Sequence, residues 1–418
     1  MSKLTRHEFL LTAAAAGAAL FFDRSFGRRA QARPRAVPPH RVVHTHSLEA
    51  TSWDYATGWY GDYVNQAVVD AMTDRGVMAL TDTTTLADAW GALLPAYTPG
   101  QKVAIKINLN NAGCTDSDNV IDALPQPVNS VIRGLKTIGV SESDIYVYDV
   151  TNGGHQGAMP ERLVNKIDAL YPAVQYDAYA SWCPIPLHLG YSATEMIHFN
   201  VPDGKPAISD RPLCNALVDA DYLINMPIMK KHGLAGVTLG FKNHFGSLEH
   251  CDYVHWSVTL GGGDYTPDYN GLLDIYNNTH IKDKTVLTVG DALYGGRFNN
   301  YEIPSPWPSF GDQPPNSLFF SIDPVAIDSV MVDYLNEEGG VRSGSDDYLA
   351  LAAASGLGAY ERWDASHEYQ VIDYQRIEVA LNLPEHLYLP LVGRGRVGTL
   401  LATCNLLLVY LFPSCTLW

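Results

Sequence analysis

Stretches rich in β-forming residues alternate with stretches of helical periodicity along this chain, and this alternation constrains the fold more than any other feature. Residues 102–109 and 145–150 are typical of strands, and 222–226 is a short apolar run that ends at a proline. Apolar residues with helical spacing occupy 128–138 and 160–170. Strands that alternate with helices pair in parallel and carry helices on their faces. We therefore predict an α/β fold with a largely parallel sheet flanked by helices.

The body of the chain is predicted to form one domain. With 418 residues, 46% hydrophobic and 17% charged, the chain can bury a large core. We place a single α/β domain at 41–385. Residues 172–212 are rich in Pro and Tyr with little periodicity, so we interpret them as a loop-rich insertion, and we interpret 211–219 as a helix.

Residues 1–36 are typical of a targeting segment and linker. Lys3 and Arg6 make the start basic, and residues 10–22 form an uncharged apolar run of signal-peptide length. Arg6-His7 stands where a twin-arginine signal has two arginines, so the segment is twin-arginine-like and general secretion stays open. We expect export to the periplasm or the extracellular space; the alternative is an N-terminal helix of the fold.

The end of the chain, 390–418, is an apolar tail. Residues 397–412 are almost wholly apolar and follow two arginines. This run is slightly shorter than the roughly 20 residues that a membrane-spanning helix needs. We expect membrane contact only if the tail is an anchor. The alternatives are a buried C-terminal element or a tail foreign to the fold.

Net charge and cysteine spacing exclude several classes of function. The formal net charge of −17 argues against nucleic-acid binding. None of the six cysteines forms a CxxC pair, so no iron–sulfur motif is seen. The GxSxG, HExxH and Walker A patterns are absent as well. The sequence therefore identifies no cofactor by motif.

Polar side chains follow three of the predicted strands. Lys106 and Asn108 end one strand, His155 lies in a glycine-bearing loop after 145–150, and a dense cluster of lysines, histidines and amides follows 222–226. Ligands of parallel α/β sheets bind beyond the carboxyl ends of the strands. We therefore predict one shared site there, because such a cluster suits an anion, metal or substrate site better than a packed core.

The motifs of this chain resemble those of the domain of unknown function 362 family. The matching elements are Lys106-x-Asn108, Pro227-x-x-Lys230-Lys231-His232, Val237-Thr238-x-x-x-Lys242-Asn243-x-x-Gly246, Gly290-Asp291 and Asp323-Pro324-Val325-Ala326-Ile327-Asp328. The resemblance runs from about Arg41 to Ile377. Members are prokaryotic, frequently carry export signals, and often bear ferredoxin-type cysteine motifs that this chain lacks. The resemblance implies functional positions at Lys106, Asn108, Lys230, His232, Thr238, Lys242, Asn243, Asp291, Asp323 and Asp328.

The first functional hypothesis is an exported enzyme that acts on a small anionic substrate. His232 is expected to be the general acid/base, since its ordinary pKa lies near neutral and nearby lysines would lower it. Lysines would hold a carboxylate or phosphate, and asparagines would orient substrate oxygens. The predicted catalytic residues are His232, Lys230, Lys242 and Asn243. The predicted substrate-binding residues are Lys106, Asn108, Thr238, His155 and Asp291.

Two alternatives stay open. The first adds a divalent transition metal, for which His244, His250, Cys251 and His255 offer nitrogen and sulfur donors. Nearby lysines oppose a bound cation unless substrate charge offsets them. The second alternative is a non-catalytic periplasmic protein that binds a small-molecule ligand or a metal. A ligand bound without turnover would favour the non-catalytic binding protein.

Overall fold

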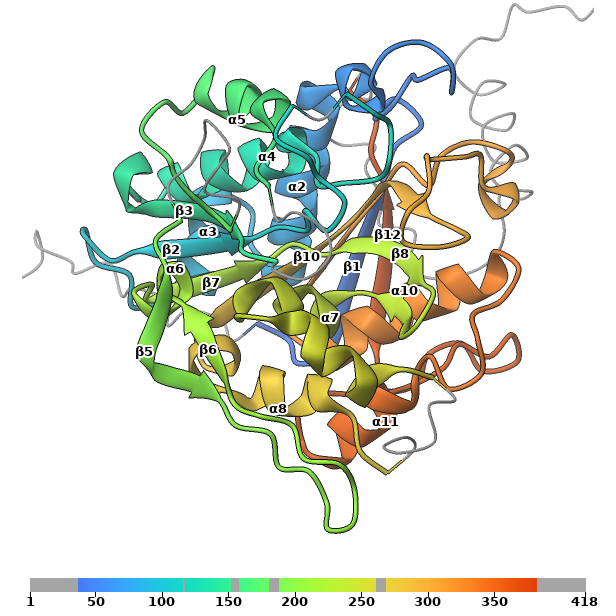
Figure 1. Ribbon diagram of the computed structural model, residues 1–418. Helices are drawn as coiled ribbons and strands as arrows, with labels where there is room; N and C mark the ends of the chain where they lie inside the picture. The colour runs from blue at the N-terminus through green and yellow to red at the C-terminus, as the bar shows by residue number, and fades with distance from the viewer. Residues whose placement is uncertain (1–36, 116, 152–157, 180–187, 261–267, 382–418) are drawn as a thin grey trace, which may run out of the picture. The chain divides into compact units, whose positions relative to one another are not determined.

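A computed structural model describes residues 37–115, 117–151, 158–179, 188–260 and 268–381, which form a ten-stranded sheet with helices on both faces and a separate two-stranded sheet (Figure 1). The strands of the large sheet are β1 (Arg41–His46), β2 (Val103–Lys106), β3 (Ile145–Asp149), β4 (Gln175–Ala178), β7 (Tyr222–Asn225), β8 (Ile228–His232), β9 (Gly236–Thr238), β10 (Thr285–Gly296), β11 (Ser317–Ser321) and β12 (Asp373–Glu378). The small sheet pairs β5 (Tyr191–Ile197) with β6 (Arg211–Cys214).

Most neighbouring strands of the large sheet run parallel. Its order is β12-β1-β11-β10-β7-β2-β3-β4, and a β8–β9 hairpin joins it where β8 pairs with β10. The pairs β1–β11, β11–β10 and β8–β9 are antiparallel, and the others are parallel. The predicted α/β fold with a largely parallel sheet is confirmed.

Parallel pairing brings the carboxyl ends of β2, β3 and β7 to one edge of the sheet. Lys106 at the end of β2 pairs with Tyr148 of β3 on one side and with Asn225 of β7 on the other. Asp149, the last residue of β3, is next to Tyr148 in the chain. Three polar side chains far apart in the sequence therefore meet at this edge.

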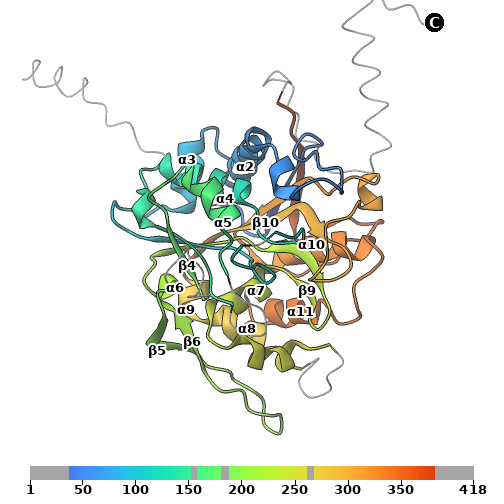
Figure 2. The same cartoon turned by 45° about the horizontal axis from the view of Figure 1, so that its top comes forward.

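Each face of the sheet buries its own hydrophobic core. Val103 and Ile105 of β2 point into one core and Ala104 points into the other, as alternation along a strand requires. Helices α2 to α5 cover the first face, and α6 to α11 cover the second (Figures 1 and 2). The helices are α2 (Gln66–Thr81), α3 (Leu86–Leu93), α4 (Pro125–Lys136), α5 (Glu161–Asp168), α6 (Asn215–Val218), α7 (Gly240–Asn243), α8 (Gly271–Asn277), α9 (Thr279–Lys282), α10 (Pro324–Glu337) and α11 (Asp347–Ala354). The 3₁₀ helices are η1 (Tyr60–Tyr63), η2 (Glu142–Asp144), η3 (His244–Ser247), η4 (Cys251–Val258) and η5 (Pro308–Phe310).

Helix α10 begins at the cap that the sequence indicates. The Asp323 carboxylate accepts hydrogen bonds from the backbone N–H groups of Val325 and Ala326, each at 2.9 Å, and Pro324 occupies the first turn. The same carboxylate accepts a hydrogen bond from the backbone N–H of Ala359 at 2.9 Å. These contacts make Asp323 a structural residue.

The strands predicted at 145–150 and 222–226, and the helices predicted at 128–138 and 160–170, are confirmed with small shifts of their ends. The helix predicted at 211–219 is wrong in its first half.

Residues Arg211–Cys214 form β6, because they pair with β5 and bury Leu213 and Cys214. The loop-rich segment 172–212 also contains two strands, β4 and β5. Tertiary pairing overrides weak local periodicity there.

The two ends of the chain lie outside the described residues. The targeting segment at 1–36 and the apolar tail at 390–418 therefore stay predictions, as do the outer limits of the domain at 41–385. Within the described ranges, no helix has the length and apolar character needed to cross a membrane.

Candidate active site

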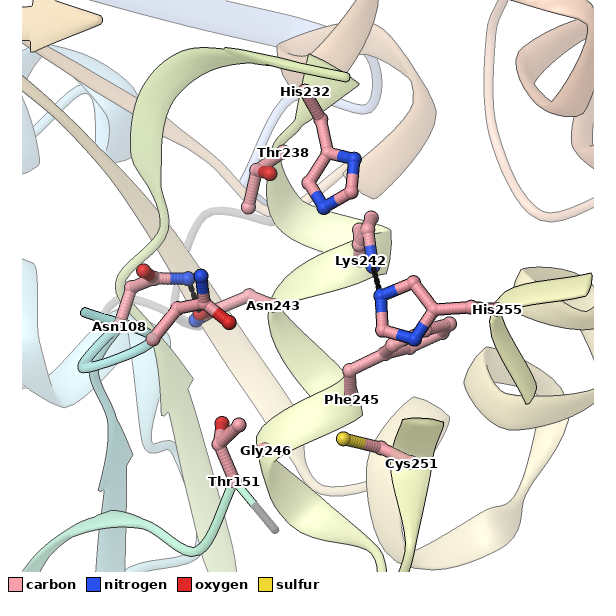
Figure 3. Close-up of a pocket in the computed structure, with 11 residues that line it drawn as sticks. Asn108, Thr151, His232, Thr238, Lys242, Asn243, Phe245, Gly246, Cys251 and His255 are labelled. Carbon is pink, nitrogen blue, oxygen red and sulfur yellow. Dashed lines mark hydrogen bonds between the residues drawn. The ribbon is translucent and has the colours of Figure 1, made fainter. Parts of the chain in front are cut away.

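A cavity with an empty volume of about 400 Å³, part of it open to solvent, lies near the carboxyl ends of β2 and β3 (Figure 3). Its walls come from the segments after these two strands, the β8–β9 hairpin, the α7–η3 segment and η4. The lining residues are Asn108, Asn110, Thr151, His232, Thr238, Lys242, Asn243, Phe245, Gly246, Cys251 and His255. Among these described residues there is one lysine and no carboxylate.

The α7–η3 segment is fixed by a carboxylate of helix α10. Asp328 accepts hydrogen bonds from the backbone N–H groups of Gly240 at 2.8 Å and Phe241 at 3.2 Å, and from the hydroxyl of Tyr348 at 2.9 Å. A Cβ atom at position 240 would lie 2.8 Å from Asp328 Oδ1, so glycine permits this close approach. Asp328 thereby sets the direction in which Lys242 and its neighbours leave the helix.

Three asparagines form a hydrogen-bonded row beside the cavity. Asn243 Nδ2 donates to Asn225 Oδ1 at 2.8 Å and to the backbone oxygen of Lys106 at 3.3 Å. Asn243 Oδ1 accepts from Asn108 Nδ2 at 3.2 Å (Figure 3). Because the Lys106 carbonyl can only accept, these contacts fix the orientation of the amides.

The row gives Asn243 and Asn108 different roles. Both polar atoms of Asn243 are used inside the protein, so the structure gives this predicted catalytic residue a positioning role. Asn108 Oδ1 has no hydrogen-bond partner among the described residues, and Asn108 lines the cavity. It can accept a hydrogen bond from a ligand.

Lys106 is a structural cation. Its Nζ contacts three acceptors, the backbone oxygen of Ile107 at 2.5 Å, Asp149 Oδ2 at 3.3 Å and Asn243 Oδ1 at 3.4 Å. An ammonium has three N–H donors, so none is left for a substrate. Burial lowers the pKa of Lys106, and Asp149 opposes that effect. The prediction that Lys106 binds substrate directly is therefore not supported by its contacts, and it does not line the cavity.

Lys242 has a different environment. Its side chain is 6% exposed, its Nζ lies 3.2 Å from His255 Nε2, and it lies 3.5 Å from the ring centroid of Phe245. The described residues form no salt bridge to it. Burial, with a smaller contribution from Lys230, lowers the pKa of Lys242 to about 7. The amine can therefore exist in both protonation states near neutral pH.

His255 accepts a hydrogen bond from Lys242. Backbone hydrogen bonds to Asp252 and Cys251 favour the protonated ring, as bonds donated by an imidazole N–H do. With Nε2 facing Lys242, the N–H lies on Nδ1, and Nε2 offers its lone pair. Burial, and then the charge of Lys242, lowers the pKa of His255 to about 3, so the ring stays neutral.

His232 is held in the opposite tautomer. Its Nδ1 accepts hydrogen bonds from the backbone N–H groups of Leu234 and Ala235, each at 3.1 Å. The neutral ring therefore carries its proton on Nε2, which points toward Lys242 (Figure 3). Burial and the charge of Lys242 lower the pKa of His232 strongly. In this geometry the neutral His232 ring can donate a hydrogen bond from Nε2, and its role as general acid/base stays a prediction.

Lys230 is a buried ammonium behind the cavity wall. It pairs across the hairpin with Thr238, which lines the cavity, and it lies two residues before His232 on the same face of β8. Its side chain is fully buried, and its Nζ has no hydrogen-bond partner among the described residues. Burial lowers its pKa to about 8. The Thr238 hydroxyl is also buried without a partner there.

The structure brings most, but not all, of the predicted residues together. Asn108, His232, Thr238, Lys242 and Asn243 line the cavity, and Lys106 and Lys230 lie behind its walls. Asp291 does not line it: this residue is buried in β10, where its Oδ1 accepts from the backbone N–H of Leu293 at 3.0 Å. Burial raises the pKa of Asp291 to about 6. His155 lies outside the described residues.

The four predicted metal ligands do not converge. Cys251 and His255 line the cavity, but His244 is buried with Nδ1 3.2 Å from Ser247 Oγ, and His250 is exposed on a left-handed backbone turn. In the described ranges no group of three or more His, Cys, Asp or Glu side chains could hold a metal ion. The four donors are close in sequence, but the fold does not bring three of them together around one point.

Sequence reasoning assigned no role to four residues that build the site. Asp149 and Asn225 hold Lys106 and Asn243, and Thr151 and Asn110 line the cavity. Asp149 and Asn225 are the last residues of β3 and β7. The same carboxyl-end argument that selected Lys106 would have found them.

Comparison with models of protein families identifies the part of the chain that contains these residues. The model of a domain of unknown function, DUF362, matches residues 103–333, more than half of the chain. The chain belongs to this family. The matched region holds every described residue that lines the cavity of this DUF362 protein.

The other comparisons are weaker. Among solved structures, this DUF362 chain is similar to the lactate racemase apoprotein from Thermoanaerobacterium thermosaccharolyticum, with 14% sequence identity and a TM-score of 0.31. The match covers 60% of this chain and 51% of that one, so the chain spans about half of the racemase. A likeness at this level says nothing of activity. No curated protein matches.

Proposed function

We propose that this DUF362 protein is an enzyme that acts on a small anionic substrate in the cavity beside Lys242. One observation carries the proposal: in a chain of net charge −17, the described lining has a lysine and no carboxylate. A second lysine, Lys230, is fully buried behind the same wall and has no hydrogen-bond partner within the described ranges. The charges of Asp122, Asp149 and Glu302 raise the pKa of Lys230, but burial is the larger effect and lowers it. A buried cation is costly, and a bound anion would further offset that cost.

The lining offers a complementary set of hydrogen-bonding groups. His232 Nε2–H and the Thr238 hydroxyl can donate to substrate oxygens, and Asn108 Oδ1 can accept from a substrate hydroxyl or N–H. A neutral imidazole that donates a hydrogen bond stabilises a developing oxyanion without itself ionising. These donors explain how a carboxylate or phosphate would be oriented, and not only attracted.

Lys242 is the group with proton-transfer capacity. A pKa of about 7 lets it give or take a proton near neutral pH, which general acid/base catalysis requires. Its hydrogen bond to His255 holds the amine in place. A titratable amine that is held in place favours catalysis over passive binding.

Thermal-shift and calorimetric screening of small carboxylates and phosphates tests this proposal. We expect a binder whose affinity is higher at about pH 6 than at about pH 9, since protonated lysines attract the anion. In Lys242→Gln we expect an affinity loss of about tenfold or more. Lys282→Gln removes the same charge from an exposed position and should bind like wild type.

Two outcomes would count against the proposal. If no small anion binds, or if Lys242→Gln binds as tightly as wild type, the cavity is not an anion site. If an anion binds but no member of its chemical class is converted, the chain is the non-catalytic binding protein considered above. Elemental analysis of natively purified protein belongs to the same study, because Cys251 and His255 share the cavity and a metal-assisted reaction stays a proposal.

We also propose export, on the basis of the first 36 residues alone. Fractionation of cells that express the full chain, beside a chain without residues 1–36, tests this. We expect the full chain outside the cytoplasm and the shortened chain inside it. Equal cytoplasmic retention of both chains would contradict the proposal.

A further inference from the structure

The Lys242 amine combines three features that a nucleophile needs. It lines the cavity, it is almost fully buried, and it has no carboxylate counterion among the described residues. Lys106 shows the opposite case in the same region, since Asp149 and two oxygen acceptors hold it as an ammonium. The two lysines therefore differ in what their nitrogen can do.

The contacts of Lys242 orient its nitrogen. In the neutral amine, one N–H donates to His255 Nε2 at 3.2 Å, and the side of the nitrogen toward Phe245 is covered by the aromatic ring. The lone pair of the amine is then free for an electrophile in the cavity. Lysine becomes a nucleophile when it is desolvated and close to another cation. Burial and Lys230 supply these two conditions.

The β8–β9 hairpin supplies the partner group. His232 Nε2 carries a proton and points toward Lys242, and the His232 and His255 rings are stacked with centroids 5.9 Å apart (Figure 3). A carbonyl group placed at the Lys242 nitrogen could receive a hydrogen bond on its oxygen from His232. The Thr238 hydroxyl, with Lys230 behind it, is suited to a carboxylate on the same small molecule.

We propose that Lys242 is a covalent catalytic residue that forms an imine with the carbonyl carbon of a small oxo acid. The proposal rests on the proposed function, because the oxo acid must first bind as an anion in this cavity. The substrate class is defined by the chemistry of the wall: a carbonyl facing an amine and an imidazole N–H, and a carboxylate facing a hydroxyl and a buried lysine.

The step balances without an oxidant or reductant. The Lys242 lone pair forms a C–N bond to the carbonyl carbon while the C=O π bond breaks. The oxygen gains a proton and the nitrogen loses one, which gives a carbinolamine. The hydroxyl then leaves as water with the remaining N–H proton, and the C=N bond forms. The imine nitrogen then takes up a proton from water. The protonated imine withdraws electrons from the neighbouring carbon atom and so promotes proton or carboxyl-group loss there.

Borohydride trapping with pyruvate, the smallest 2-keto acid, tests the proposal on the full chain. Borohydride reduces an imine to a stable amine, so mass spectrometry of the intact protein and of its peptides locates the adduct. We expect one adduct per chain, on Lys242, in about tenfold excess over any other lysine. An excess of lactate, which has the carboxylate but a hydroxyl in place of the keto group, should compete for the cavity and lower the yield of the adduct.

Two variants and one competition make the result decisive. Lys242→Arg keeps the charge and should give no adduct, whereas Lys231→Arg changes a neighbouring lysine that donates to the backbone oxygen of Glu338 and should react like wild type. Circular dichroism checks that the variants fold. Lactate competition in the wild-type chain tests the site independently of any substitution.

The outcomes separate this proposal from the one on which it rests. Pyruvate that stabilises the protein against heat but leaves no adduct on Lys242 overturns the imine and leaves anion binding intact. An adduct spread evenly over surface lysines, unaffected by lactate, overturns it as well. If pyruvate, lactate and other small anions all fail to bind, both proposals fall.

Discussion

At the scale of residues, identical side chains have different roles because their surroundings differ. Lys106 has three acceptors, one of them the Asp149 carboxylate; Lys242 has a histidine and an aromatic ring; and Lys230 has no hydrogen-bond partner among the described residues. Only the last two keep capacity to interact with a ligand. Residue type predicted a cationic site, while the contacts decide which cation is structural.

Lys230→Met is expected to stabilise the protein and to weaken anion binding. The pKa of Lys230 is lowered from 10.5 to about 8, so protonating this group costs folding free energy below about pH 8. Between these values the unfolded chain binds more protons, and wild-type stability rises with pH. We expect the variant to gain roughly 1–3 kcal/mol near neutral pH, and less as the pH approaches 10.5.

Urea unfolding of wild type and Lys230→Met at neutral and alkaline pH measures this gain. The matched control is Lys282→Met, at an exposed position, where we expect a change within about 0.5 kcal/mol at either pH. A Lys230→Met protein that is less stable than wild type at neutral pH would show that the buried ammonium does not lower the free energy of unfolding. Stability gained at the expense of binding is typical of functional sites.

At the scale of elements, the short α7–η3 segment carries much of the site, and its position is imposed by other elements. It is too short to be stable as an isolated helix. Asp328 of α10 binds its N-terminus, and Asn225 of β7 donates to the backbone oxygen of Gly240 at 2.9 Å. The site therefore depends on residues that never contact a ligand.

Asp328→Ala should damage the site from outside it. The change leaves two backbone N–H groups and the Tyr348 hydroxyl without their buried acceptor. We expect a loss of about 2–4 kcal/mol in unfolding free energy and a clear loss of anion affinity. Asp328→Asn keeps one acceptor oxygen and removes a carboxyl whose pKa burial raises to about 7, so its cost should be smaller.

Chemical denaturation and calorimetry on the two Asp328 variants measure these effects. Glu337→Ala, at an exposed position of the same helix, is the control and should change stability by less than about 0.5 kcal/mol. Wild-type anion affinity in folded Asp328→Ala would contradict the view that α10 positions Lys242.

Gly246→Ala should disrupt the Lys106–Asp149 pair. A Cβ atom at position 246 would lie 2.0 Å from Asp149 Oδ1 and 2.7 Å from Lys106 Nζ, so one of these buried groups must move. We expect a loss of about 2–4 kcal/mol, the cost of breaking a buried ion pair.

Gly91→Ala is the matched control for this substitution. Nothing lies within 4 Å of a Cβ at position 91, inside α3, and there we expect a gain of about 0.5–1 kcal/mol. Thermal and urea unfolding of both alanine variants provide the comparison. If Gly246→Ala unfolds with the same free energy as wild type, the Lys106–Asp149 pair can rearrange without a loss of stability.

At the scale of the whole molecule, the sheet combines the first and last described segments. Strand β12 pairs in parallel with β1 along all six residues, and its Tyr374 hydroxyl contacts His44 Nδ1 at 2.7 Å and the Tyr334 hydroxyl at 2.8 Å. Among the described residues, β12 is therefore the edge strand beside β1. We expect the fold to require β12 and not the apolar tail.

Two truncations test this view. We expect a chain that ends at residue 381 to keep the melting temperature of the full chain within about 3 °C. A chain that ends at residue 371 lacks β12 and should lose at least about 5 °C or fail to fold. Scanning calorimetry of the full chain and the two truncated chains measures these melting temperatures. Equal melting temperatures for both truncations would show that β12 contributes little, and a large loss at 381 would assign the tail a structural role.

The sequence alone determined the fold class and the region of the site. Alternating periodicity depends on local chemistry, and the carboxyl ends of parallel strands are a general place for ligands, so Asn108 and Lys242 could be found without coordinates. The cap at Asp323 was predictable for the same local reason. The DUF362 motifs pointed to the same segments.

Only the tertiary structure decided what each of these residues can do. Protonation, tautomer and hydrogen-bond saturation depend on atoms that are distant in the chain: Asp149 neutralises Lys106, two backbone N–H groups fix His232, and His255 faces Lys242. Spacing along a loop could not show that His244, His250, Cys251 and His255 form no common metal site in the described part of the chain. Burial and long-range contacts set these properties, and a linear pattern of residue types contains neither.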